Sequence, residues 1–299
     1  MKNLVLVAIS FVLTTAGYSQ YNECAKQNVI EKEVAVEVYD ESTQTVKIEK
    51  QKRQVDSDEY GNAAGSQYDL AVDGAFEGQT VAVLHLYTGG GFNFKQPENA
   101  LRQKGFSVYR WINQPPSAKK LEEALKKACQ LWIISDQQRK LNDDHLDVIQ
   151  AFFNSGKGVY IWGDNNPYYA DANFVAEGLL DVKMEGNTMG NKTVDILSRE
   201  SQSGLMPNHL ITTGLQNIYE GITIATIQEN QELTPIIYGS AGNLVAATYE
   251  KDGKRLIFDG GFTRLYVNWD TAGTGRYVKN AAAWLVNYER FGDKVVAME

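Results

Sequence analysis

The amino-acid sequence predicts an α/β protein with a doubly wound, mostly parallel sheet, preceded by an N-terminal extension that carries a β-hairpin. Three observations support this fold class. Short apolar strands alternate with amphipathic helices from about residue 79 onward, the residues before 78 are rich in charge, and strand-like segments dominate the second half. With 43% hydrophobic residues among 299, the chain can bury one large core.

The first 19 residues, MKNLVLVAISFVLTTAGYS, have the pattern of a secretory signal peptide. One early lysine is followed by an apolar run from Leu4 to Leu13 and then by small and polar residues, and we expect cleavage after Ser19. The alternatives are a buried helix or a membrane anchor, but the run is short for a hydrocarbon core of roughly 30 Å. We therefore expect a secreted or extracellular protein, periplasmic in a bacterium, with no membrane span in the mature chain.

The extension, residues 20–77, contains two alternating segments, 33–39 (EVAVEVY) and 45–50 (TVKIEK), separated by a turn at 40–43. They predict a hairpin with one apolar face, formed by Val34, Val36, Val38, Val46 and Ile48. An isolated hairpin is marginally stable in water, so we expect it to dock on its own domain or to self-associate with another chain through a free strand edge. Docking is the simpler alternative. Residues 56–73 have the composition of a flexible linker.

Two features of the sequence leave alternatives open. Lys52 and Arg53 are either a dibasic processing site or a solvated charge cluster. Cys24 and Cys129 are the two cysteines, which an exported protein can pair, but Cys129 also fits the pattern of a buried helical residue.

The domain, residues 78–299, begins with four strand-and-helix units. We expect strands at 80–87, 106–111, 131–135 and 158–162, and helices at 97–104, 117–129, 142–154 and 170–180. This order predicts parallel strands with helices on both faces and right-handed crossovers. The second half adds strands at 222–227, 235–238, 244–249 and 255–258, a hairpin turn at 251–254, and a final helix at 275–288.

This domain resembles the class I glutamine amidotransferase-like superfamily, a flavodoxin-like group, over about residues 79–290. The likeness rests on LWIISD (131–136), on NDDHLDVIQAFFNSGKGVYIWG (142–163) and on KRLIFDGGFTRLY (254–266). Catalytic members have a nucleophilic cysteine in the turn after the fourth strand and a histidine late in the chain. Here that turn is Gly163-Asp164, and the last histidine is His209. The resemblance therefore implies a non-catalytic member, a pseudoenzyme that binds a ligand or serves as a scaffold.

Polar residues follow the predicted strand ends, which a parallel sheet brings to one edge, and ligands bind at this edge in open α/β folds. They are Gly89, Gly90 and Gly91, then Asp136, then Asp164, Asn165 and Asn166, and finally Asp259. The glycines allow a close approach of the backbone to a ligand. The three carboxylates make calcium the one cofactor we consider, because calcium prefers oxygen ligands. Asp and Asn also commonly serve as helix caps and turn formers.

Arg264 and Trp269 belong to a second dense segment, residues 262–270. Aromatic rings and planar polar groups suit sugar or peptide recognition, because the rings stack and the polar groups form hydrogen bonds. The alternative is that Trp269 and Tyr266 seal the core beneath the last helix.

These observations predict an exported, non-catalytic binding or structural protein, such as an extracellular scaffold that assembles through its hairpin and binds a glycan or a cation. The alternative is a hydrolase that acts on glycans or amides through Asp136, Asp164 and Asp259. A net charge of −8 without a basic stripe excludes nucleic acid as the expected partner.

Overall fold

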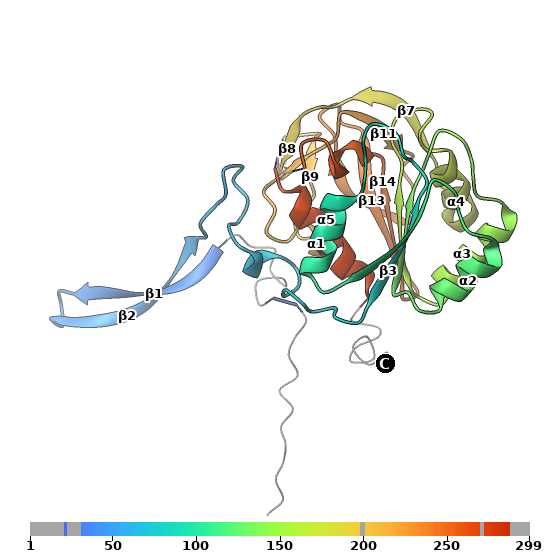
Figure 1. The fold of residues 1–299 in the computed structure, drawn as a ribbon. Helices are drawn as coiled ribbons and strands as arrows, with labels where there is room; N and C mark the ends of the chain where they lie inside the picture. Colours follow the sequence, from blue (N-terminus) through green and yellow to red (C-terminus); the bar gives the residue numbers. More distant parts are fainter. Residues whose placement is uncertain (1–20, 23–30, 198–200, 270–271, 288–299) are drawn as a thin grey trace, which may run out of the picture.

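The computed structural model describes residues 21–22, 31–197, 201–269 and 272–287 (Figure 1). The predicted signal peptide and Cys24 lie outside the described residues, so export and a pairing of the two cysteines stay predictions. The Cys129 thiol is half-buried and donates to the carbonyl oxygen of Thr80 at 3.3 Å. No helix in the described part of the chain is both long and apolar enough to cross a membrane.

An eight-stranded sheet forms the centre of the domain, and its parallel part has the strand order β4-β3-β5-β6-β14. β13, β12 and β9 continue the sheet in antiparallel pairing. In chain order the parallel strands follow the flavodoxin-like pattern, which confirms the predicted fold class. The strands are β3 (Thr80–His85), β4 (Ser107–Ile112), β5 (Gln130–Ile134), β6 (Gly158–Trp162), β9 (Gly204–Leu205), β12 (Leu233–Tyr238), β13 (Leu244–Lys251) and β14 (Lys254–Asp259).

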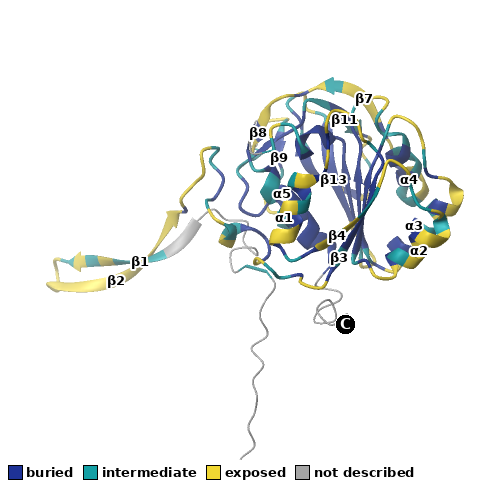
Figure 2. Cartoon of the chain, in the orientation of Figure 1, coloured by how far each residue is buried: buried dark blue, intermediate teal, exposed yellow. Residues whose placement is uncertain are grey.

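Helices cover both faces of this sheet, and the five helices of the described residues lie where the sequence predicts a helix. On one face are α1 (Lys95–Gln103) and α5 (Thr274–Leu285), and on the other are α2 (Ala118–Leu125), α3 (Asp143–Asn154) and α4 (Ala170–Leu180) (Figure 1). Every residue of β5 and β6 is buried, as expected for parallel strands between two helical layers (Figure 2). Short 3-10 helices occupy Ser66–Tyr68, Leu210–Thr212 and Phe262–Leu265.

Two pairs of short strands, from residues 184–195 and 217–227, form an arm, and the sequence predicted only the last of these strands. β7 (Met184–Met189) pairs with β11 (Thr223–Ile227), and β8 (Thr193–Asp195) pairs with β10 (Asn217–Tyr219). The β7–β11 pair lies over the carboxyl ends of the central strands. There the Ala225 amide donates to the Gly260 carbonyl at 3.0 Å, and the Asn166 amide donates to the Gly186 carbonyl at 3.0 Å.

The predicted hairpin is present as β1 (Glu31–Asp40) and β2 (Thr45–Gln54), but it projects away from the domain instead of docking on it (Figure 1). Tyr39, Val46 and Ile48 are 60%, 58% and 73% exposed. Lys52 and Arg53 lie within β2 and are exposed, so processing at this position remains a prediction.

The single apolar face predicted for the hairpin is wrong. The register pairs Tyr39 with Val46 and Val38 with Lys47. Directly paired residues of antiparallel strands share a face, so the valines of β1 at 34, 36 and 38 lie on one face and Val46 and Ile48 on the other. The turn at 41–44 sets this register, and a shift by one residue would have reversed the outcome.

Residues 56–73, predicted as a flexible linker, instead pack against the domain. Ala63, Leu70 and Ala71 are buried, and the Asn62 side-chain oxygen accepts from the amides of residues 216 and 217 at 2.7 and 2.8 Å. The segment also contributes Asp69, whose carboxylate is fully buried. The folded domain therefore includes residues that composition alone assigned to the extension.

Asp69 is the centre of a buried ion cluster that holds this segment in place. Its carboxylate oxygens lie 2.9 Å from Lys104 Nζ, 2.7 Å from Arg276 Nε and 2.7 Å from Lys279 Nζ. Burial alone would raise the pKa of Asp69, but the three cations outweigh it and lower the pKa below its usual value. The cluster joins residues 56–73 to α1 and α5.

Candidate functional site at the carboxyl ends of the strands

Asp259 and Arg264 form a buried ion pair, and the Asp259 carboxylate also accepts hydrogen bonds from other groups of the protein. Asp259 Oδ2 lies 3.0 Å from Arg264 Nη1, and both side chains are 0% exposed. The same oxygen accepts from the hydroxyls of Tyr277 at 3.0 Å and Tyr160 at 3.3 Å, and Oδ1 accepts from the Gly261 amide at 2.9 Å. Burial raises the pKa of Asp259, although the adjacent guanidinium opposes this. These two predicted ligand-binding residues fix the loop after β14 instead of facing a ligand.

Asp136, Asn165 and Asn166 also have internal roles. Asp136 Oδ2 lies 2.7 Å from Lys140 Nζ, and its Oδ1 accepts from the following amide at 2.8 Å. The Asn165 side-chain oxygen accepts from the Thr223 hydroxyl at 2.7 Å, which ties the turn after β6 to the arm. Asn166 is exposed and contributes its backbone amide to the same arm. The three predicted carboxylates therefore do not form a shared set of free oxygen ligands.

Asp164, the second residue after β6, is the predicted site residue that remains chemically available. Its side chain is buried, with 6% exposure, and its Oδ1 has no hydrogen-bond partner among the described residues. Burial raises the pKa of the Asp164 carboxyl to about 7, and the Asn165 amide and the Arg264 charge offset this only in part. At neutral pH the Asp164 carboxyl is therefore partly protonated, and it can donate a hydrogen bond in its neutral form and accept one in its charged form.

Tyrosine side chains from three separate segments gather beside Asp164. The Tyr87 and Tyr168 rings meet edge to face with centroids 5.6 Å apart, and the Tyr87 and Tyr266 hydroxyls both lie beside Gly90. Burial raises the pKa of Tyr87 and of Tyr266, and the Asp164 charge adds to both shifts. All three tyrosines are half-buried. Phe262 packs beneath them, with its centroid 5.2 Å from that of Tyr87 and 5.5 Å from that of Tyr266.

The glycine turn at 89–91 lies against the hydroxyls of Tyr87 and Tyr266. Gly90 has φ of +60°, and a Cβ added there would lie 3.0 Å from Tyr266 Oη and 3.1 Å from Tyr87 Oη. A side chain at this position would therefore occupy the space over the two hydroxyls. We call Tyr87, Tyr168, Tyr266 and Asp164, together with this turn, the tyrosine site.

Trp269 lines a different pocket. This pocket has a volume of about 420 Å³ at the start of α5, and its other lining residues include Asp58, Tyr60, Arg276 and Lys279. The indole is half-buried and packs against the main hydrophobic core. The Trp269 ring therefore packs against the core, and recognition of a ligand by this residue stays a prediction.

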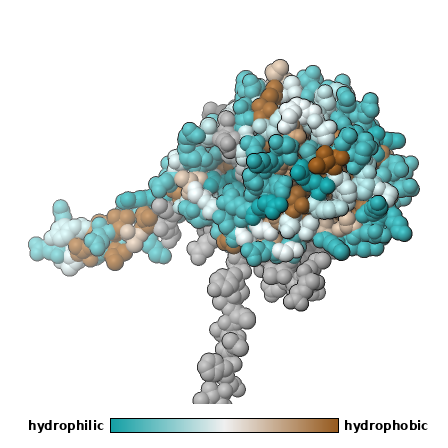
Figure 3. All heavy atoms as spheres, viewed as in Figure 1, coloured by the Kyte–Doolittle hydropathy of each residue, from teal (hydrophilic) through white to brown (hydrophobic). Residues whose placement is uncertain are grey.

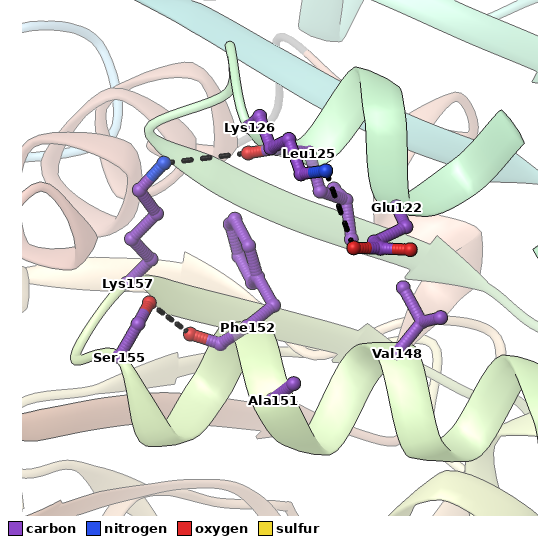
Figure 4. Close-up of a pocket in the computed structure, with 8 residues that line it drawn as sticks. All are labelled: Glu122, Leu125, Lys126, Val148, Ala151, Phe152, Ser155 and Lys157. Carbon is purple, nitrogen blue, oxygen red and sulfur yellow. Dashed lines mark hydrogen bonds and ion pairs between the residues drawn. The ribbon is translucent and has the colours of Figure 1, made fainter. Parts of the chain in front are cut away.

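A second pocket, of about 330 Å³, lies between α2 and α3 (Figure 4). Figure 4 shows Phe152 on its floor and the Lys157 ammonium at one end, where it donates to the Leu125 carbonyl at 3.3 Å. Lys157 precedes β6 whereas Asp164 follows it, so this pocket lies at the opposite end of the sheet from the tyrosine site. A third pocket, of about 560 Å³, lies beside the edge strand β4.

The described residues contain no group of three or more His, Cys, Asp or Glu side chains placed to hold a metal ion. The tyrosine site thus consists of hydroxyls, aromatic edges, a glycine turn and one carboxyl group. The sequence predicted Asp164 and the glycines as site residues, and Tyr266 was predicted only as a residue beside Trp269. Tyr87, which follows β3, and Tyr168, which precedes α4, were not predicted.

Comparisons with known proteins give a likeness of fold. No family model and no curated protein matches the chain. Among solved structures it is similar to a ThuA-like protein from Parabacteroides merdae, with TM-score 0.44 and 10% identity over 70% of this chain and 90% of that one. It is also similar to the glutaminase domain of Trypanosoma brucei CTPS, with TM-score 0.36 and 10% identity over 69% and 94%.

An exo-β-1,4-mannosidase from Opitutaceae bacterium strain TAV5 gives TM-score 0.38 and 10% identity over 72% of this chain. The chain spans 36% of the length of that enzyme. At such identities the function has to be inferred from the residues of this chain.

Proposed function

We propose that this protein is an exported, non-catalytic binding protein that holds a neutral, hydroxyl-rich ligand, of which a glycan is the leading example, at the tyrosine site. The observation that carries the proposal is Asp164, a buried carboxyl group with an unpartnered oxygen beside half-buried tyrosine hydroxyls. The N-terminal sequence pattern supports export, and the absence of cysteine and serine from the turn after β6 supports a non-catalytic role.

The chemistry of the site favours a neutral ligand. Tyrosine hydroxyls and a carboxyl group with a pKa of about 7 can each donate or accept a hydrogen bond, which matches the hydroxyl groups of a sugar. Aromatic rings provide apolar surface for the C–H face of the same ligand. Arg264 already neutralises Asp259, and the Asp164 carboxyl, with a pKa of about 7, is only partly charged at neutral pH, so the site carries little charge to attract a small ion.

The hydrolase alternative requires a pair of free carboxyl groups. Two of the three candidate carboxylates, Asp259 and Asp136, already form ion pairs within the protein. Asp259 holds Arg264 and two tyrosines, and Asp136 holds Lys140. A general acid without a second carboxylate or an activated nucleophile does not complete the usual glycosidase arrangement. Binding without turnover is therefore the function that this geometry supports best.

A glycan array followed by calorimetry with the sugar that binds best tests the proposal. Tyr266→Phe removes one hydroxyl and keeps the ring, and we expect it to weaken binding about tenfold, since a net hydrogen bond contributes about 1 to 1.5 kcal/mol. The matched control is Tyr109→Phe on the edge strand β4, where the side chain is 54% exposed and distant in the sheet order from β6; it should bind like wild type.

Two outcomes would contradict the proposal. Equal affinity of the wild type and Tyr266→Phe would place the ligand elsewhere. Release of product from the bound glycan, lost in Asp164→Asn, would make the protein a hydrolase. A calcium titration in the same calorimeter tests the cation expectation, and we expect no heat of binding from the engaged carboxylates.

A further inference from the structure

The two strands of the hairpin carry opposite charge. β1 has four carboxylates and one cation, and β2 has four cations and one carboxylate: Glu31, Glu33, Glu37, Asp40 and Lys32 in β1, and Lys47, Lys50, Lys52, Arg53 and Glu49 in β2. The hairpin is a two-stranded sheet, so within the described chain each strand has one edge without a neighbouring strand. One molecule thus presents an acidic edge and a basic edge on the same projecting element.

This opposite charge of β1 and β2 favours one way of pairing two hairpins over the others. Two β1 edges, or two β2 edges, would place like charges side by side, which is unfavourable across paired strands. The β1 edge of one hairpin against the β2 edge of another places opposite charges together. Inside the hairpin, Asp40 of β1 already forms an ion pair with Lys47 of β2.

Exposed apolar residues on the hairpin also favour its association with another surface. Brown, apolar residues are visible along the projecting hairpin in Figure 3, among teal polar ones. Tyr39, Val46 and Ile48 on one face are more than half exposed, and the valines of β1 on the other face are only half-buried. Adding a strand along either edge extends both of these partly apolar faces, because side chains of adjacent strands contact each other.

We propose that the hairpin joins copies of this chain head to tail, with β1 of one copy pairing antiparallel to β2 of the next. The two surfaces of such a contact differ, so each added copy leaves one free β1 edge and one free β2 edge, and the contact generates an open chain of subunits unless its rotation closes a ring. The inference is independent of the tyrosine site, and the partner is a second copy of this protein. The hairpin stands clear of the domain, which leaves both edges accessible (Figure 1).

Sedimentation and light scattering of the purified protein over a concentration series test this contact. We expect the weight-average mass to rise continuously with concentration, and the association to weaken with salt because exposed charges are screened. Lys50→Glu with Lys52→Glu makes both edges acidic, and Glu33→Lys with Glu37→Lys makes both edges basic. Each double variant alone should associate at least tenfold more weakly than wild type, and an equimolar mixture of the two should recover association.

The matched control is Lys95→Glu with Lys119→Glu, which changes net charge as much as the β2 variant but lies on α1 and α2, at exposed positions of the domain. It should associate like wild type. Far-ultraviolet circular dichroism and unfolding in urea establish that each variant is folded. The proposal is overturned by a wild type that stays monomeric at all concentrations, by a mass that reaches a plateau at a closed dimer, or by a mixture that fails to recover association.

Discussion

The buried Asp164 carboxyl should make this protein less stable as the pH rises, and Asp164→Asn should remove that effect. Asparagine has nearly the same shape, remains neutral at every pH, and its amide can donate as the protonated acid does. The variant therefore changes the ionisation of the site with little change in packing.

The magnitude follows from the pKa of this group. Burial raises the pKa of Asp164 from 3.8 to about 7, a difference of about 3 units, and each unit corresponds to about 1.4 kcal/mol. Because the folded-state pKa lies above the unfolded one, the penalty is absent below about pH 4, grows between pH 4 and 7, and is complete above pH 7. We expect the variant to match wild type near pH 4 and to be more stable by up to about 4 kcal/mol at pH 8.

Urea unfolding at several pH values between 4 and 8, followed by tryptophan fluorescence, measures this difference. Trp162 is fully buried two residues before Asp164 and reports on the same region. The free energy of unfolding of the variant minus that of wild type is the informative quantity, because other titrating groups contribute equally to both. A difference that stays constant within about 0.5 kcal/mol from pH 4 to 8 would show that Asp164 is not held in a buried, desolvated state.

Three further predictions concern the domain. Asp69→Asn removes the buried carboxylate that three cations share and should cost about 3 to 5 kcal/mol in urea unfolding. Asp73→Asn, at a side chain with 45% exposure, should cost about 1 kcal/mol or less. Burial lowers the pKa of His209 to about 4, so the folded protein loses stability as the pH falls from 6.5 to 4 and protonation of this histidine favours the unfolded chain. We expect His209→Asn to reduce this loss of unfolding free energy by about 3 kcal/mol, measured by urea unfolding at pH 7 and pH 4. Gly260→Ala would place a methyl group 2.3 Å from a backbone carbonyl of β11. We therefore expect a lower melting temperature in calorimetry. An unchanged melting temperature would show that β11 can move away from the methyl group without loss of stability.

The sequence alone determined the central architecture. Alternation of apolar strands and amphipathic helices is a local property, and it placed β3, β5, β6 and β14 and all five helices, because strands buried on both faces read as continuous apolar runs. The sequence also identified the turn after β6 as the position where ligands approach such a sheet. The existence of the hairpin followed from the same kind of local pattern.

Tertiary structure decided what the site contains. Asp259 had the same strand-end position as Asp164, yet Arg264, Tyr160 and Tyr277 from other elements engage it and leave Asp164 as the available carboxyl group. Tyr87, Tyr168 and Tyr266 come from three separate segments, and no short-range pattern records that they meet.

The same reason explains the polar segment at residues 56–73 and the hairpin. Composition predicted a solvated linker, but Asp69 is buried because three cations, at 104, 276 and 279 in the chain, supply the charge that water would otherwise provide. The turn fixed which valines share a face, and the hairpin projects from the domain instead of docking on it. Local pattern specifies the elements of a fold, whereas burial, charge neutralisation and register depend on which distant residues they meet.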